Sequence, residues 1–115
     1  MNTESRSADD VFAALLHARQ EGRAVILATV IATRGSVPRH AGSKMIIDPS
    51  DGSMVGTIGG GCGEADVIAA ARDVATSGTP RLLHVELTDS IDSFSPAVCG
   101  GVMDVFIERV AAERR

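Results

Sequence analysis

Hydrophobic residues recur at helical spacing in two stretches of the chain and predict two amphipathic helices. Across residues 8–21, apolar side chains return every three or four positions, which places them on one helix face. Ser7 is the expected N-cap of this helix, and Gly22 is the expected stop because glycine tolerates the left-handed backbone that ends many helices. Residues 64–76 show the same spacing and are followed by Gly78. The sequence therefore predicts one helix near the N-terminus and one in the middle of the chain.

Other segments carry strand patterns. Residues 24–33 form a nearly continuous apolar run rich in β-branched side chains, which is typical of a strand buried on both faces at the centre of a sheet. Residues 45–47 and 54–58 flank an Asp-Gly turn and predict a hairpin. Alternation of apolar and polar residues across 81–88 and 102–110 predicts two further strands, the first of them half-exposed.

Length and composition indicate one domain, residues 1–115, with an α/β fold: a mixed β-sheet of about five strands with two helices. The 44% of hydrophobic and 23% of charged residues are typical of a soluble globular protein. No apolar run approaches the roughly 20 residues of a membrane helix, and no secretory signal is visible, so we expect a cytoplasmic protein without a membrane span. The net charge of -4 and the absence of Trp and Tyr argue against a nucleic-acid partner.

The clearest chemical signal is the glycine-rich turn before the second predicted helix. Gly59, Gly60 and Gly61 precede Cys62, although each glycine costs about 0.5–1 kcal/mol relative to alanine in regular structure. Such a turn exposes the first N–H groups of a helix to an anion, and a helix N-terminus lowers the pKa of a thiol, which then acts as a nucleophile or soft metal ligand. A tight strand-to-helix turn with a buried cysteine is the alternative. The segment matches neither nucleotide-binding glycine motif.

Two more loops carry residues of related character. Residues 34–44 include Arg34, Arg39 and Lys44 and no acidic side chain, which fits either an anion site or a solvated basic loop. A second thiol beside glycines is formed by Cys99, Gly100 and Gly101. In a reducing compartment we expect both cysteines to be free thiols.

The three segments with these features are ATVIATRGSVPRHAGSKMII, DGSMVGTIGGGCGEADVI and VCGGVMDVFIERV, in that order. Together they resemble the N-terminal domain of the XdhC/CoxI family, accessory proteins for molybdenum hydroxylases such as xanthine dehydrogenase and carbon monoxide dehydrogenase. The resemblance covers most of the chain from Ala24 onward. It implies binding of the molybdenum cofactor (molybdopterin), a pterin dithiolene with a phosphate tail, and delivery of that cofactor to a partner apoenzyme.

The resemblance also implies which residues form the site. The family's glycine-flanked cysteine falls on Cys62 and the acid after it on Glu64. We expect Arg34, Arg39 and Lys44 to hold the anionic part of the cofactor while Cys62 faces or ligates the metal. The complete set of predicted cofactor-binding residues is Arg34, Gly35, Ser36, Pro38, Arg39, Lys44, Gly59, Gly60, Gly61, Cys62, Glu64, Cys99, Gly100 and Gly101.

The implied function is that of a chaperone or maturation factor rather than an enzyme. Its expected partner is a molybdenum hydroxylase apoenzyme. Longer family members continue into a Rossmann-type domain that is not present in this sequence, so a separate Rossmann-type subunit is a second candidate partner, and a homo-oligomer is a third. Two other functions stay open at this point: a thiol-dependent sulfur carrier or oxidoreductase using Cys62, and a protein-binding assembly module without a cofactor.

Overall fold

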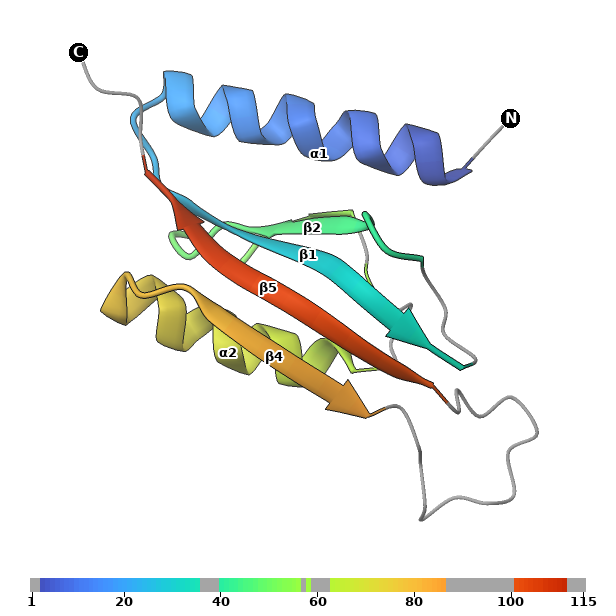
Figure 1. Ribbon diagram of the computed structural model, residues 1–115. Coiled ribbons are helices and arrows are strands. Elements are labelled where there is room, and N and C mark those ends of the chain that lie inside the picture. Colours follow the sequence, from blue (N-terminus) through green and yellow to red (C-terminus); the bar gives the residue numbers. More distant parts are fainter. Residues whose placement is uncertain (1–2, 36–39, 57, 59–62, 87–100, 112–115) are drawn as a thin grey trace.

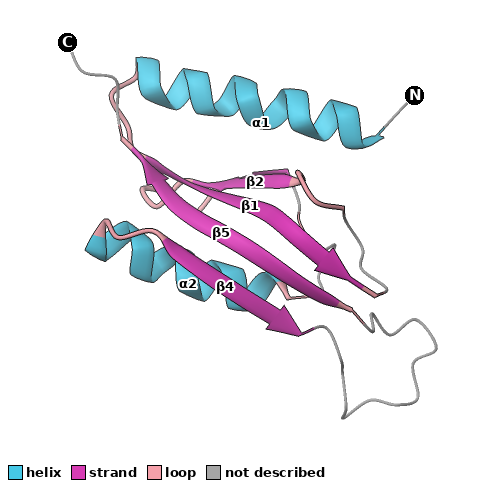
Figure 2. Ribbon diagram, in the orientation of Figure 1, coloured by secondary structure: helices cyan, strands magenta, loops and turns pink. Residues whose placement is uncertain are grey.

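The computed structural model describes residues 3–35, 40–56, 58, 63–86 and 101–111. A five-stranded sheet lies between two helices, one on each face (Figures 1 and 2). In chain order the elements are α1 (Thr3–Gln20), β1 (Val25–Arg34), β2 (Lys44–Ile47), β3 (Met54–Gly56), α2 (Glu64–Ser77), β4 (Arg81–Glu86) and β5 (Val102–Val110). The predicted α/β class, the two helices and the five strands are confirmed.

The strand order is β3-β2-β1-β5-β4, and each of the four pairings is antiparallel. The expected mixture of parallel and antiparallel pairing is therefore corrected. The chain does make a strand–helix–strand crossover from β3 through α2 to β4, and these two strands run in the same direction. They occupy opposite edges of the sheet, however, so they never pair with one another.

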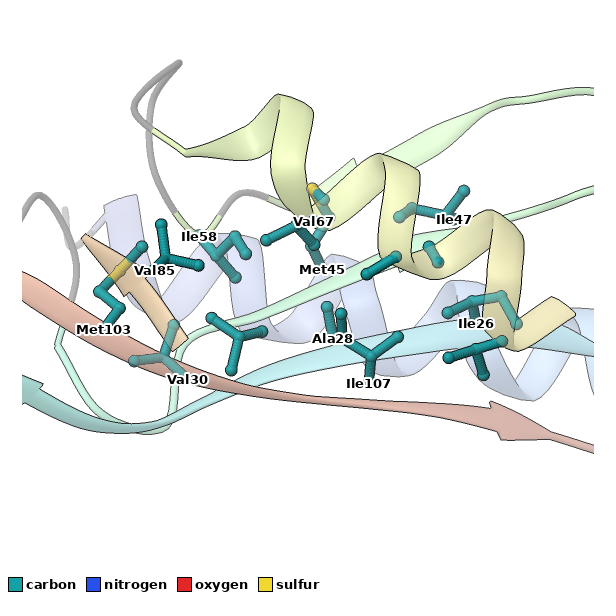
Figure 3. Close-up of a cluster of buried hydrophobic side chains, with 14 residues drawn as sticks. Ile26, Ala28, Val30, Met45, Ile47, Ile58, Val67, Val85, Met103 and Ile107 are labelled. Carbon is teal, nitrogen blue, oxygen red and sulfur yellow. The ribbon is translucent and has the colours of Figure 1, made fainter. Parts of the chain in front are cut away.

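The two faces of the sheet carry separate hydrophobic cores, and β1 contributes to both. Ile26, Ala28 and Val30 belong to the larger core, which packs against α2 (Figure 3). Val25 belongs to the smaller core under α1, and Leu27 packs against that core. Because alternate side chains of β1 are buried on opposite faces, the strand shows no alternation of apolar and polar residues.

The predicted burial of β1 on both faces holds only for its first part. The pairing with β5 is irregular between Val30 and Ala32, and beyond this point Ile31 and Ala32 are exposed.

The predicted boundaries of the first helix are also corrected, because α1 begins at Thr3 and ends at Gln20. Ser7 lies inside the helix rather than at its N-cap. The residues before it include Glu and Arg, which propagate a helix well, so the helix begins before the pattern of apolar residues does. Among the described residues, neither helix is long and apolar enough to span a bilayer.

A polar contact ties the α1–β1 connection to the β2–β3 turn. Asp48 is only 5% exposed, and its Oδ2 accepts a hydrogen bond from the guanidinium of Arg23. Its Oδ1 accepts hydrogen bonds from the backbone N–H of Ser50 at 2.9 Å and from the Ser50 hydroxyl at 2.6 Å. Arg23 also donates to Glu21, and this hydrogen bond lowers the pKa of the Glu21 carboxyl. We call this contact the Arg23–Asp48 clasp.

Candidate functional site

The elements that flank the three candidate segments meet at one end of the sheet. Arg34, the last residue of β1, pairs with Val102, the first residue of β5, and Val102 in turn pairs with Glu86, the last residue of β4. The helix α2 begins at the same end, beside the end of β4 (Figure 1). We call this region, marked by Arg34, Gly63, Glu86 and Val102, the loop end of the sheet.

At the loop end, α2 starts without a side-chain cap. Its N-cap residue is Gly63, in a left-handed conformation with φ 76° and ψ -3°, and glycine adopts this conformation without strain. The first N–H groups of a helix have no acceptor within the helix and carry the positive end of its dipole. Glu64 and Asp66 in the first turn complement that dipole, and Glu64 is half-buried. The start of α2 thus presents N–H donors next to two carboxylates.

The basic loop contributes Arg34 to this end. Arg34 is exposed and forms no ion pair with another described residue. Gly35 follows with φ 73°, so the chain leaves β1 through a turn that glycine favours. Because Thr33 pairs with Met103, which is buried on the α2 side, the Arg34 side chain leaves β1 on the α1 side. The guanidinium is available to an anion at that side of the loop end.

Lys44 also lies on the α1 side of the sheet, away from the start of α2. Its neighbour Met45 is buried in the core under α2, so the alternation of a strand turns the Lys44 side chain toward α1. There its Nζ donates to the carbonyl oxygen of Gly42 at 3.0 Å and lies 5.9 Å from the centroid of the Phe12 ring. The structure does not bring Lys44 together with the start of α2.

Gly56, at the start of the glycine-rich stretch, has a packing role that sequence reasoning missed. Its φ is 85°, and a Cβ at this position would lie 2.6 Å from the Lys44 carbonyl oxygen and 2.6 Å from Cγ2 of Val11. The bare backbone lets α1 approach the sheet. The available signal was a glycine inside the predicted strand 54–58, which often marks a close approach of another part of the chain.

Of the remaining predicted residues, Gly101 is buried directly before β5, at the loop end. Nine predicted residues lie outside the described part of the chain: Ser36, Pro38, Arg39, Gly59, Gly60, Gly61, Cys62, Cys99 and Gly100. Their roles stay predictions, including metal contact by Cys62.

The residues that the structure describes contain no group of three His, Cys, Asp or Glu side chains able to hold a metal ion. The nearest approach to such chemistry is an exposed pair on β4 and β5, where Nδ1 of His84 lies 2.8 Å from Oδ1 of Asp104. These residues pair directly across the two strands. The pair lies on the α1 side of the sheet, because the neighbouring Val85 and Met103 are buried on the α2 side.

Comparison with known proteins identifies the family of this chain. A model of the XdhC and CoxI family matches residues 18–86. The uncharacterized protein YqeB of Escherichia coli strain K12 is 38% identical over 81 residues, which cover 70% of this chain and 15% of YqeB. A probable xanthine dehydrogenase subunit of Bacillus subtilis strain 168 is 31% identical over 104 residues, which cover 89% of this chain and 30% of that protein.

A solved structure shares the fold. The crystal structure of a xanthine dehydrogenase from Bacillus halodurans matches with a TM-score of 0.72 and 30% identity, over 88% of this chain and 30% of the other. The chain thus spans 15% to 30% of the length of these relatives. The family match extends from the end of α1 through β4 and so includes the basic loop, the glycine-rich turn and the start of α2. The chain belongs to the XdhC and CoxI family.

Proposed function

We propose that this chain binds the molybdenum cofactor and acts as an accessory protein for enzymes of the xanthine dehydrogenase type. Membership of the XdhC and CoxI family supports this role, as do the two relatives whose names refer to xanthine dehydrogenase. Because the chain spans at most 30% of those two relatives, we assign it the binding step alone. The receiving partner in this proposal is the apoenzyme of a molybdenum hydroxylase, and a separate Rossmann-type subunit completes the assembly.

The observation that carries the proposal is the loop end of the sheet. The uncapped start of α2 occurs at the same end as the guanidinium of Arg34, which pairs with no acid in the described part of the chain. N–H donors and an arginine are the groups that bind phosphate in proteins, and their occurrence at one end of the sheet supports a site for the anionic tail of the cofactor there. Cys62 directly precedes Gly63 in the sequence, and a thiolate suits a soft metal or its sulfur ligands.

Each group has a separate task in the proposed site. The start of α2 holds the phosphate, and Arg34 adds positive charge from the α1 side of the same sheet end. Cys62 orients the metal end, and the carboxylate of Glu64 is stabilised by the positive end of the helix. Lys44 is not part of the proposed site because its ammonium is held by the Gly42 carbonyl oxygen and lies over the Phe12 ring of α1. When bound, the cofactor supplies the redox chemistry of the receiving enzyme, whereas this chain binds, orients and releases it.

The test is co-purification of the cofactor. The chain is isolated without oxygen from a host that makes the molybdenum cofactor, and molybdenum and pterin are measured per mole of chain by mass spectrometry and by fluorescence after oxidation. We expect both to be present in the wild type. Cys62→Ala should reduce loading by about ten-fold or more, the scale seen when a group supporting a metal site is removed. Arg34→Ala should reduce it less.

Arg19→Ala is the matched control. Arg19 is an exposed arginine in the last turn of α1, at the far end of the molecule from the start of α2 (Figure 1). Its loss should leave loading unchanged. A wild-type chain without pterin would rule out the proposed function, and equal loading of wild type and Cys62→Ala would remove Cys62 from the site.

A further inference from the structure

A groove runs along α2 on the side that faces the β2–β3 hairpin. Its larger hollow has a volume of about 500 Å³, and the buried side chains of Ile26 and Ile47 line it together with the exposed Met54 and the partly buried Ile68. A second hollow of about 370 Å³ adjoins the first and shares Ile26 with it. The two hollows form one elongated trough, which we call the α2 groove.

The groove exists because α2 does not cover the whole sheet. The helix packs mainly on β1, β4 and β5, so the β2–β3 hairpin extends beyond it. On the side of α2 that faces the hairpin, Ala71 and Ala75 line the groove. Their short side chains do not fill the gap. Met54 is consequently 49% exposed, although a methionine of this size would bury considerable apolar area if the groove were occupied.

Two arginines give the groove a positive charge. Arg72 lines the larger hollow and Arg109 the smaller one. Neither forms an ion pair with a described residue, whereas Arg23 and Arg81 both do. In a protein with a net charge of -4, an apolar trough with a cation in each of its two hollows is complementary to a ligand that combines apolar and acidic groups.

We propose that the α2 groove is the docking site for an acidic amphipathic segment of a partner protein. An amphipathic helix places apolar side chains at intervals of three or four residues into such a groove, and its flanking carboxylates reach the cations beside it. The apolar side chains contact Ile26, Ile47 and Met54, and the carboxylates pair with Arg72 and Arg109. The proposal does not depend on cofactor binding, because the groove extends toward the start of β1 and the end of β5, away from the loop end.

The test is a titration with a designed probe. The probe is a fluorescein-labelled synthetic peptide of about four helical turns, with leucines at the buried positions and glutamates at the others. A second peptide has the same leucines and lysines in place of the glutamates. Fluorescence anisotropy should show saturable binding of the acidic peptide alone.

Two variants of the protein address the two parts of the proposal. Ala75→Leu fills the trough where its two hollows meet, and the double variant Arg72→Glu, Arg109→Glu reverses its charge. Each should raise the dissociation constant of the acidic peptide by about ten-fold or more, which is about 1.4 kcal/mol of binding free energy. Arg19→Glu, an exposed arginine on α1 outside the groove, is the charge control and should change the dissociation constant by less than about two-fold.

Two further measurements check that each variant is folded and that the peptide binds in the α2 groove. Thermal unfolding confirms that each variant is folded, and methyl NMR shifts of Ile26, Ile47 and Ile68 should move on addition of the acidic peptide. The proposal is overturned if both peptides bind equally, if neither binds, or if the groove variants bind like the wild type. It is also overturned if light scattering shows a dimer that Ala75→Leu converts to a monomer, because the groove would then hold a second copy of this chain.

Discussion

At the scale of single residues, Gly56 sets how closely α1 approaches the sheet. A Cβ there would meet backbone on one side and Val11 on the other, each at 2.6 Å, and its φ of 85° strains any other residue. We therefore predict that Gly56→Ala lowers the free energy of unfolding by about 2–4 kcal/mol, from backbone strain and overpacking together. Urea denaturation followed by circular dichroism measures this loss.

Gly52 provides the matched control for this substitution. Its φ of 76° is similar, but a Cβ at Gly52 would meet nothing within 4 Å. Gly52→Ala should therefore cost only the backbone strain, about 1–2 kcal/mol. Equal losses for the two variants would show that contact with α1 has no part in the effect of Gly56→Ala.

Residue patterns predicted some site positions and missed others. The start of α2 directly after the glycine-rich turn occurs where the sequence predicts it, because helix spacing is a property of the local chain. The side of the sheet that Lys44 faces could not be predicted from the basic loop. It follows from the burial of Met45 under α2, which is a contact between residues distant in the sequence.

At the scale of elements, the Arg23–Asp48 clasp joins the α1–β1 connection to the β2–β3 turn. Asp48→Ala removes a buried acceptor of three hydrogen bonds and leaves Arg23 with Glu21 as its remaining partner. We predict a loss of about 2–3 kcal/mol in the free energy of unfolding, since hydrogen bonds to a buried carboxylate are lost. Equilibrium unfolding in urea tests this value.

A second aspartate in the same turn serves as the control. Asp51 is exposed, and its Oδ1 accepts a hydrogen bond from the backbone N–H of Ser53 at 2.9 Å, which lowers the pKa of the Asp51 carboxyl. Asp51→Ala should have a clearly smaller effect than Asp48→Ala, because water replaces the lost contact. If Asp51→Ala proves as damaging as Asp48→Ala, the clasp is not what stabilises the turn.

At the scale of the whole molecule, the strand order predicts where the fold is most stable. Both β1 and β5 are paired on two sides, whereas β3 and β4 are edge strands and β3 has only three residues. We predict that amide hydrogens in β1 and β5 exchange slowest, near the rate set by global unfolding, and that those in β3 exchange about a hundredfold faster. Hydrogen exchange followed by NMR measures both rates, and equally slow exchange in β3 would contradict the prediction.

Apolar spacing alone was sufficient to identify the elements, because hydrophobic periodicity is a local property that one element expresses by itself. The two helices, the hairpin and the last two strands all occur close to their expected positions. The order of the strands required contacts across the chain. The insertion of β5 between β1 and β4 brings Arg34 beside Val102, residues that the sequence separates by most of the fold.

By itself, the sequence determined the secondary structure, the fold class and, through the resemblance of three motifs, the family. Each depends on residue types and spacings within short segments. Only the tertiary structure decided that the flanks of these motifs meet at one end of the sheet. It also decided that the missing side chain of Gly56 lets α1 approach the sheet, and that α2 leaves a groove beside the hairpin. These features depend on which faces pack together, and packing involves residues that no local pattern relates.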